Sequence, residues 1–348
     1  MTHVRHITLA AAAAVALLGT ALPAQAQGTT GGSLNIVCSV QDEWCSLMST
    51  TFARVSGIKV NMIKRSTGEA LAQLIAEKSN PKTDIWFGGT GDPHMQAAEL
   101  DLTLEYKSPT LPQLHTWAQL QAQQSGWKTV GVYSGPLGFA YNTELLAKRG
   151  LKAPSCWKDL LAPGFKGEIQ VANPNSSGTA YTMVATLVQL MGEDAAFEYM
   201  KGLHRNVSQY TRSGTGPIKA AARGETTVSI SFVHDAPGEQ AQGFPLATRT
   251  PCEGTGAEIG SMSIVKGARN LEAAKKFYEW ALTPAAQQFA ATARQFQLPS
   301  NKGASLDPRI PDFRQIRFIQ YDYAKYGRSA ERRRLIERWE REVNSLPR

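Results

Sequence analysis

The chain has 348 residues, 42% of them hydrophobic, and a formal net charge of +8 at pH 7. A chain of this length is too long for one ordinary core, so we predict two domains, each with an apolar interior of its own. The basic residues are partly concentrated at 328–341, where glutamates are interspersed with them. This mixture is typical of a solvated helix, and we therefore expect no nucleic-acid partner.

Residues 1–26 have the pattern of a signal peptide. Arg5 precedes an apolar run at 7–18, and Ala24-Gln25-Ala26 supplies small residues for cleavage. The apolar run is shorter than the roughly 20 residues that cross a bilayer, which argues against a membrane anchor. No cysteine follows directly for attachment of a lipid. We therefore expect cleavage after Ala26 and a mature protein released into the periplasm.

From Leu34 onward, short apolar strands alternate with amphipathic helical segments. This alternation is typical of an α/β fold with a mainly parallel sheet. The first run predicts strands at 34–37, 59–63 and 84–87 and helices at 43–55 and 69–78. Its third strand leads into a glycine-rich turn at 88–93. We interpret the aromatic and methionine side chains of these helices as core residues and expect no cofactor.

A second run with the same pattern begins near Phe139. It predicts strands at 168–171 and 228–232 and a helix at 179–191. The apolar stretch at 258–265 then returns to the first lobe and is followed by helices at 271–282 and 284–292. We therefore predict one lobe from 33–135 and 258–348 and a second lobe from 136–257. Ligands of such sheets bind outside the carboxyl ends of the strands, so two facing lobes predict one cleft.

Cys38, Cys45, Cys156 and Cys252 remain in the mature chain. An even number of cysteines in an oxidising compartment favours disulfides, and no Cys-x-x-Cys spacing indicates zinc. Four cysteines allow three pairings. We favour Cys38 with Cys45, which are close in sequence, and Cys156 with Cys252, which would join two segments of one lobe.

Four loops combine glycine with small hydroxyl residues at points where a helix is expected to begin. At such points, free backbone N–H groups and the helix dipole favour an anion. The best is Asn175-Ser176-Ser177-Gly178-Thr179, whose hydroxyls can donate to phosphate oxygens while its glycine allows a ligand to come close. An ordinary helix cap would explain one of these hydroxyls but not a row of them. Comparable loops are 65–68, 89–91 and 212–216, and Ser39 directly follows the first strand.

His234 and Asp235 follow the strand at 228–232, and Glu258 stands at the start of the next apolar stretch. Carboxylates and an imidazole can bind sugar hydroxyls through strong, charge-assisted hydrogen bonds. A His-Asp pair can equally be a structural hydrogen bond. Its position at the carboxyl end of a strand favours a role in ligand binding.

The sequence contains none of the common catalytic or nucleotide-binding motifs that we sought. It has no Gly-x-Ser-x-Gly, no Gly-x-x-x-x-Gly-Lys-Ser and no Gly-x-Gly-x-x-Gly. We therefore expect a binding protein rather than an enzyme. A periplasmic hydrolase of a phosphorylated sugar is the alternative from another class.

Several segments together resemble the ferric-iron-type family of ABC-transporter solute-binding proteins. They are the signal segment, the strand at 34–37, Gly57-Ile58-Lys59-Val60, Thr83-Asp84-Ile85-Trp86, Gly135-Pro136-Leu137-Gly138-Phe139-Ala140-Tyr141-Asn142 and Ser176-Ser177-Gly178-Thr179. The resemblance covers nearly the whole mature chain. It implies a two-lobed type II periplasmic-binding-protein fold, hinge closure on a small anionic solute, and delivery by a monomer to an inner-membrane ABC permease.

Iron-binding members of this family carry adjacent tyrosines after the strand equivalent to 228–232, where this sequence has Val233 and His234. It also has glycines at 88 and 89, where those proteins place a carboxylate, which disfavours ferric iron. The pattern is instead similar to the branch that binds hexose phosphates. That resemblance implies sugar contacts by His234, Asp235 and Glu258 and phosphate contacts by Ser39, Thr67, Thr90, Ser176, Ser177, Gly178 and Thr179. A phosphonate such as 2-aminoethylphosphonate, or ferric iron, is the alternative ligand.

Overall fold

The computed structural model describes residues 1–2 and 32–348. Apart from its first two residues, the predicted signal peptide lies outside these ranges, and so does its cleavage site. Within the described ranges, no helix combines the length and the apolar composition needed to cross a membrane.

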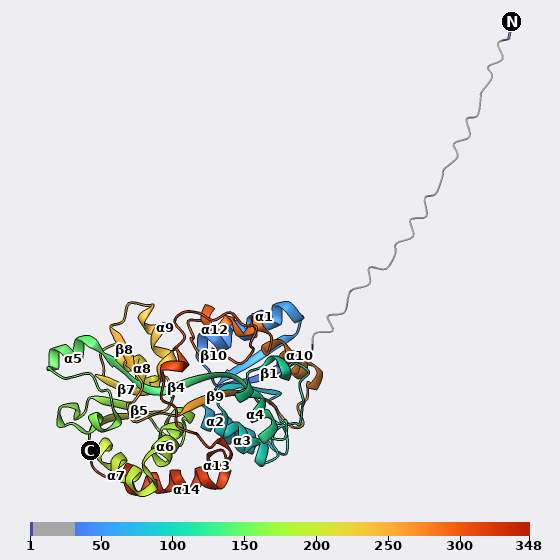
Figure 1. Ribbon diagram of the computed structural model, residues 1–348. Helices are drawn as coiled ribbons and strands as arrows, with labels where there is room; N and C mark the ends of the chain where they lie inside the picture. Colours follow the sequence, from blue (N-terminus) through green and yellow to red (C-terminus); the bar gives the residue numbers. More distant parts are fainter. Residues whose placement is uncertain (3–31) are drawn as a thin grey trace. The chain divides into compact units, whose positions relative to one another are not determined.

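The strands are β1 (Ser33–Cys38), β2 (Lys59–Lys64), β3 (Ile85–Thr90), β4 (Val130–Asn142), β5 (Ile169–Ala172), β6 (Val207–Thr211), β7 (Val228–Phe232), β8 (Leu246–Arg249), β9 (Ala257–Ile264) and β10 (Leu298–Pro299). They form one sheet in the order β2-β1-β3-β9-β4-β7-β5-β6, with β8 and β10 also paired to β4 (Figure 1). At one end β1 is parallel to β2 and β3, and at the other end β5 is parallel to β6 and β7. The antiparallel pair β4 and β9 joins these two parallel ends.

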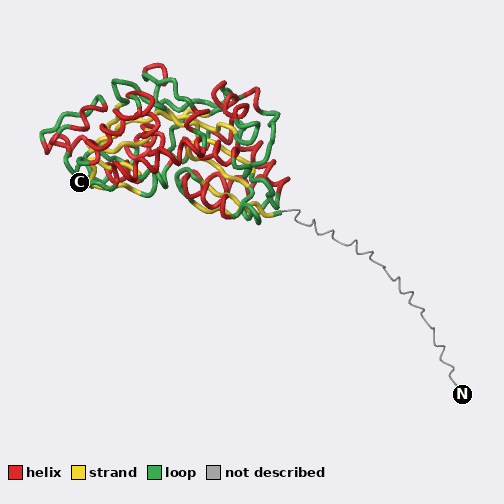
Figure 2. The backbone as a smooth tube through the Cα atoms, turned by 90° about the horizontal axis from the view of Figure 1, so that it is seen from below, coloured by secondary structure: helices red, strands yellow, loops and turns green. Residues whose placement is uncertain are grey.

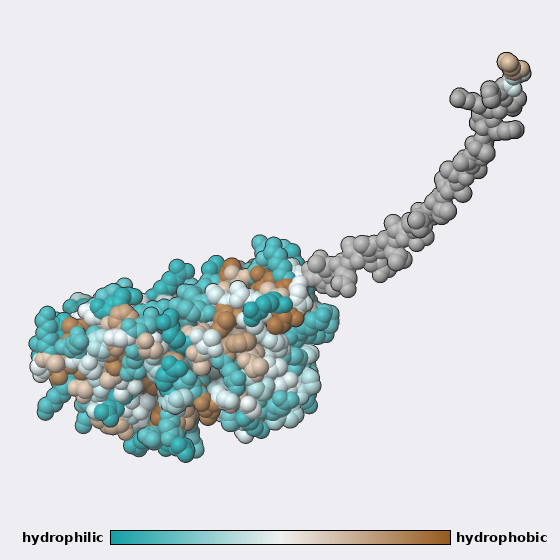
Figure 3. All heavy atoms as spheres, turned by 90° about the horizontal axis from the view of Figure 1, so that it is seen from above, coloured by the Kyte–Doolittle hydropathy of each residue, from teal (hydrophilic) through white to brown (hydrophobic). Residues whose placement is uncertain are grey.

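The helices are α1 (Asp42–Ser56), α2 (Thr67–Ala76), α3 (Gly91–Glu99), α4 (Thr116–Gln124), α5 (Thr143–Arg149), α6 (Gly178–Met191), α7 (Glu193–His204), α8 (Gly216–Ala222), α9 (Ala236–Gln240), α10 (Leu271–Ala281), α11 (Pro284–Gln287), α12 (Phe289–Thr292), α13 (Tyr323–Tyr326) and α14 (Ser329–Trp339). Short helical turns are η1 (Leu111–Gln113), η2 (Trp157–Leu161), η3 (Pro163–Phe165), η4 (Val233–Asp235), η5 (Phe313–Gln315) and η6 (Glu340–Asn344). In Figure 2 the strands run between the helices. Figure 3 shows mainly hydrophilic residues on the face that it presents.

The predicted strands and helices are found close to their expected bounds, with two differences. The turn expected at Gly88 and Gly89 is part of β3, whose register with β9 shifts there. Both glycines have positive φ angles, 76° and 84°, so they allow the bulge that other residues would resist. The single helix expected at 284–292 is divided into α11 and α12.

The long strand β4 belongs to both ends of the sheet. All 13 of its residues are buried. Residues 130–136 pair with β9, and residues 137–141 pair with β7. Each end of the sheet carries its own large core. One core contains Trp44, Phe87 and Phe277, and the other contains Phe139, Trp157 and Tyr181. We propose that these cores define the first and the second lobe.

We propose that the C-terminal helix α14 belongs to the second lobe. The prediction placed 258–348 in the first lobe, but Leu335, Trp339 and Val343 are buried in the core of the second. The helical spacing of these residues predicts an apolar face but does not say which lobe will cover it. α14 packs against α6 and also contacts α3, and the turn η6 that continues α14 packs against α7.

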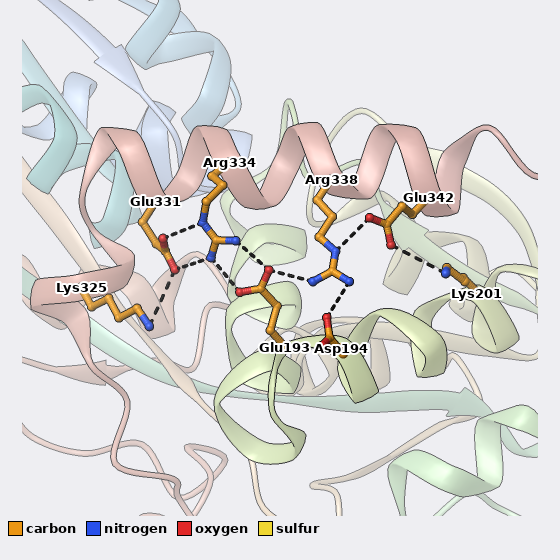
Figure 4. Close-up of polar contacts among 8 residues, drawn as sticks. All are labelled: Glu193, Asp194, Lys201, Lys325, Glu331, Arg334, Arg338 and Glu342. Atoms are coloured by element: carbon orange, nitrogen blue, oxygen red, sulfur yellow. Dashed lines mark hydrogen bonds and ion pairs between the residues drawn. The ribbon is translucent and has the colours of Figure 1, made fainter.

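Ion pairs also fasten α14 to α7 (Figure 4). Glu193 accepts hydrogen bonds from Arg334 at 2.6 and 2.8 Å and from Arg338 at 2.8 Å. Arg338 further donates to Asp194 at 2.8 Å and to Glu342 at 3.0 Å. The hydrogen bonds from Arg334, and then those from Arg338, lower the pKa of Glu193 to about 2. The end of the chain is therefore held on the second lobe by charge as well as by core packing.

The favoured cysteine pairings are confirmed. Cys38 is bonded to Cys45, which links the end of β1 to α1, and Cys156 is bonded to Cys252 within the second lobe. Cys156 and Cys252 also lie within reach of Glu253 as potential metal ligands, but both sulfurs belong to the disulfide.

Candidate functional site

A polar cavity lies where the carboxyl ends of β1, β2 and β3 face η4 and the loop before α6. It holds about 470 Å³ of space not filled by protein atoms, part of it continuous with solvent. The cavity is lined by Ser39, Val40, Gln41, Lys64, Ser66, Thr67, Gly89, Thr90, Tyr133, Ser177, Thr179, Ser213, Gly214, Thr215, Phe232, His234, Asp235, Glu258 and Gln297. Both lobes contribute, so the cavity lies in the predicted cleft.

Several helices begin at this cavity. α2 starts at Thr67, α3 follows Thr90, and α6 follows Ser177. Thr90 and Ser177 occupy N-cap positions, yet neither side chain makes a capping hydrogen bond. This argues against interpreting them as ordinary helix caps. The first N–H groups of each helix have no partner within the helix and carry partial positive charge, so the wall favours an anion.

Three hydroxyls on this wall can donate to a ligand. Ser39 Oγ accepts a hydrogen bond from Trp86 Nε1 at 2.9 Å, which leaves the serine proton free. Tyr133 Oη accepts from the backbone N–H of Gly89 at 2.9 Å and likewise keeps its proton. Among the described residues, the buried Oγ1 of Thr90 has no hydrogen-bond partner. The wall is therefore rich in neutral donors.

Glycines allow close packing around this cavity. A Cβ atom on Gly178 would lie 1.8 Å from Thr90 Oγ1, so any side chain would separate α6 from β3. A Cβ atom on Gly89 would lie 2.8 Å from both Ser39 Cβ and Thr67 Oγ1. The close packing around the cavity therefore depends on both glycines.

The opposite wall carries His234, Asp235 and Glu258, whose side chains are 1%, 7% and 5% exposed. His234 Nε2 lies 3.4 Å from Glu258 Oε1 and 3.6 Å from Asp235 Oδ1. The imidazole stacks on Phe232 with ring centroids 5.5 Å apart. It also packs against Gly135, where a Cβ atom would lie 1.8 Å from Nδ1. The backbone of β4 thus holds the ring facing the two acids.

Burial controls the protonation of this cluster. It lowers the pKa of His234 to about 3, so the imidazole is neutral at pH 7. It raises the pKa of Asp235 to about 7, against smaller opposing effects that include the charges of Lys219 and Lys64. Burial, and then the charges of Asp235 and Asp92, raise the pKa of Glu258 well above its ordinary value. A protonated carboxyl both donates and accepts hydrogen bonds, which matches the needs of a hydroxyl group.

Direct contacts between the lobes flank the cavity. The side-chain amide of Gln41 donates to Asp235 Oδ1. The backbone N–H of Gly68 donates to the carbonyl of Ser176 at 3.1 Å. Arg212 also pairs with Glu69. These contacts bring both walls within reach of one small solute.

All the predicted ligand residues line the cavity except Ser176 and Gly178. The Ser176 hydroxyl donates to the carbonyl of Arg212 at 2.8 Å and so ties two of the predicted loops together. Gly178 instead faces Thr90. Contact of any of these residues with a ligand stays a prediction.

Four further polar lining residues were missed by the sequence analysis: Gln41, Lys64, Tyr133 and Gln297. Gln41 lies two residues after Ser39 and could have been found as part of the same loop. The Lys64 ammonium donates to the carbonyl of Val40 and lies 3.5 Å from Asp42, while burial lowers its pKa. Tyr133 and Gln297 carry no local signal, because their positions depend on how β4 pairs.

Comparison with known proteins supplies the family. Residues 80–326 match the model of the bacterial extracellular solute-binding proteins. An uncharacterized protein of Haemophilus influenzae is 44% identical over 330 residues, covering 94% of this chain and 95% of that protein. The periplasmic binding protein AfuA of Actinobacillus pleuropneumoniae, solved with exogenous fructose-6-phosphate bound, is 47% identical. Its TM-score is 0.89, with 90% of this chain and 99% of AfuA covered.

A second solved structure, of the periplasmic binding protein P5PA, is 41% identical with a TM-score of 0.87, covering 90% of this chain and 99% of that one. These similarities confirm the predicted type II periplasmic-binding-protein fold and the expectation of a binding protein rather than an enzyme. This chain belongs to the bacterial extracellular solute-binding proteins, as a periplasmic binding protein.

Proposed function

We propose that the protein captures a hexose phosphate in the periplasm and delivers it to an ABC permease of the inner membrane. One observation carries the proposal. A single cavity joins the starts of several helices on one wall to the buried cluster His234, Asp235 and Glu258 on the other. A ligand that fills it needs an anionic end and a hydroxyl-rich end.

The helix-start wall suits a phosphate group. Helix N-termini bind phosphate through free N–H groups and the helix dipole, and the hydroxyls of Ser39, Thr67, Thr90, Ser177 and Thr179 add donors. Lys64 is the cationic side chain among the lining residues. Binding by neutral donors in an enclosed site is less sensitive to salt than binding by exposed lysines.

The acidic wall suits the sugar. Each sugar hydroxyl can donate one hydrogen bond and accept others. The neutral imidazole and the two carboxyls, whose protonated forms burial favours, offer both functions. AfuA, which is 47% identical to this chain, was solved with fructose-6-phosphate bound, and this supports the same class of ligand. The residues after β7 are Val233 and His234 rather than paired tyrosines, and this disfavours ferric iron.

Ligand contacts to residues of both lobes would stabilise the closed arrangement of the lobes. A solute that binds only when both lobes are in place shifts the equilibrium from open to closed by its differential affinity for the two states. The closed form is the one that we propose the permease recognises.

Calorimetry on the purified mature protein tests the proposal. We expect binding of glucose 6-phosphate or fructose 6-phosphate, and much weaker binding of glucose or inorganic phosphate alone. Binding of 2-aminoethylphosphonate but not of the sugar phosphates would support anion binding by the helix-start wall and would contradict a sugar phosphate as the ligand. Binding of ferric citrate alone, or hydrolysis of the sugar phosphate, would overturn the proposal altogether.

A further inference from the structure

Arg332 on α14 lies against the outer side of the anion loop, which we define as residues 173–179. Its Nη2 donates to the carbonyls of Pro174 at 3.0 Å and of Asn175 at 3.4 Å. Its guanidinium lies over the ring of Tyr181, 5.1 Å from the centroid. The side chain of Asn175 donates to Glu340, just beyond the same helix. The C-terminal helix therefore supports the loop at two points.

The hydrogen bonds inside the loop explain why this support matters. Asn175 N–H donates to Asn173 Oδ1 at 2.9 Å, and the N–H groups of Ser176 and Ser177 donate to Asn173 O at 3.2 and 2.9 Å. These N–H groups are therefore occupied. The N–H groups left for an anion are those of the first turn of α6, which begins at Gly178. Fixing the carbonyls of Pro174 and Asn175 fixes the direction in which that turn points.

Arg332 differs from the neighbouring arginines in its ion pairing. Arg334 pairs with Glu193 and Glu331, and Arg338 pairs with Glu193, Asp194 and Glu342. In the part of the chain that the structure describes, Arg332 forms no ion pair, and its Nε has no hydrogen-bond partner. Its positive charge is thus not neutralised by a contacting carboxylate, and it stands behind the start of α6.

We propose that Arg332 is a positioning residue for the phosphate group of the solute, because it holds the anion loop and places positive charge behind it. The inference rests on the proposed function. The charged or titratable groups that act on Arg332 are Asp92 from α3 and Tyr181 from α6. Burial raises the pKa of Asp92 to about 7, and so its negative charge only partly offsets the arginine near neutral pH.

A positive charge behind the loop stabilises a dianion more than a monoanion, because the Coulomb energy is proportional to the ligand's charge. A phosphate ester approaches two negative charges at pH 7, whereas a sulfate ester of the same sugar carries one. The ratio of the affinities for glucose 6-phosphate and glucose 6-sulfate therefore measures this effect. Packing changes alone would weaken both ligands alike.

The test is calorimetry with both ligands on the wild type, Arg332→Met, Arg332→Lys and the control Arg333→Met. Arg333 is exposed on the same helix, so its substitution removes one positive charge at a solvent-exposed position. We expect Arg332→Met to reduce the preference for the phosphate at least several-fold. Arg332→Lys should keep most of that preference, and Arg333→Met should keep all of it.

An unchanged ratio in Arg332→Met, or a loss of the preference in Arg332→Lys or Arg333→Met as large as that in Arg332→Met, would overturn the positioning role while leaving the proposed function intact. Failure of the wild type to bind glucose 6-phosphate would instead overturn the proposed function. Thermal unfolding of each ligand-free variant confirms that affinities are compared between folded proteins. Should Arg332→Met fail to fold, Arg332→Gln provides the same comparison with a polar side chain of similar length.

Discussion

The imidazole of His234 and the carboxyl of Glu258 face each other at 3.4 Å, and both side chains are almost fully buried. They come from η4 and β9, which are separate in sequence and meet at β4. Since burial makes the imidazole neutral and favours the protonated acid, the pair is suited to neutral hydroxyls rather than to a cation.

Substitution of either residue should weaken sugar-phosphate binding. We expect His234→Ala and Glu258→Ala each to cost about 1–3 kcal/mol of binding free energy, because the partner groups in the ligand and on the wall would be left unpaired. Calorimetry with glucose 6-phosphate measures the effect. Wild-type affinity in both variants would show that these residues do not contribute to ligand binding.

Gly178→Ala should hinder closure of the lobes. Its Cβ atom would lie 1.8 Å from Thr90 Oγ1, which belongs to the facing lobe, so we expect binding to fall at least about tenfold. The matched control is Gly202→Ala in α7, where the nearest atom is the flexible Cδ2 of Leu161 at 3.2 Å. Equal affinities of the two variants would contradict the role assigned to the close contact.

Asp92→Asn should change how stability depends on pH. Burial raises the pKa of Asp92 to about 7, so the folded protein keeps a proton that the unfolded chain, with a pKa of about 3.9, has lost. The favourable contribution of the protonated acid is fully present below the unfolded pKa and is lost as pH rises through the folded pKa. The stability of the wild type relative to Asp92→Asn should therefore fall between about pH 4 and about pH 7, by at most about 1.4 kcal/mol per pH unit.

Urea unfolding of both ligand-free proteins across that interval tests this prediction. The buried histidines act in the opposite direction, since burial lowers the pKa values of His94 and His234 to about 3, but they are present in both proteins and cancel in the difference. Parallel stability curves would show that Asp92 does not titrate as predicted.

Glu193→Gln should loosen the attachment of α14 to α7. Glu193 accepts from both Arg334 and Arg338, so we expect a loss of about 0.5–1.5 kcal/mol in the free energy of unfolding, and a smaller loss at high salt. Glu198→Gln is the control, because its pair with Lys201 involves a carboxylate that is 72% exposed. The prediction fails if both variants lose the same stability or if salt has no effect.

Much of the fold and of the site could be predicted from the sequence because the relevant signals are local. The alternation of strands and helices reflects residue spacing along the chain, and the loops before α2, α3 and α6 combine small hydroxyl residues with glycine where helices start. Parallel strands bring their carboxyl ends to one edge, so such loops were expected to meet. Cys38 and Cys45 are close in sequence, which favoured their pairing.

Features that depend on contacts between distant segments could not be predicted and follow from the tertiary structure. Tyr133 reaches the cavity because β4 lies between β9 and β7, and Gln41 meets Asp235 because the two lobes are in contact. The spacing of Leu335 and Trp339 predicts an apolar face on α14. It does not predict that this face packs into the core of the second lobe. The helices and strands, the loops before the helices and the apolar faces follow from neighbouring residues, so they could be predicted from the sequence. Which faces meet, and which charges remain unpaired beside the site, depended on long-range packing that no local spacing encodes.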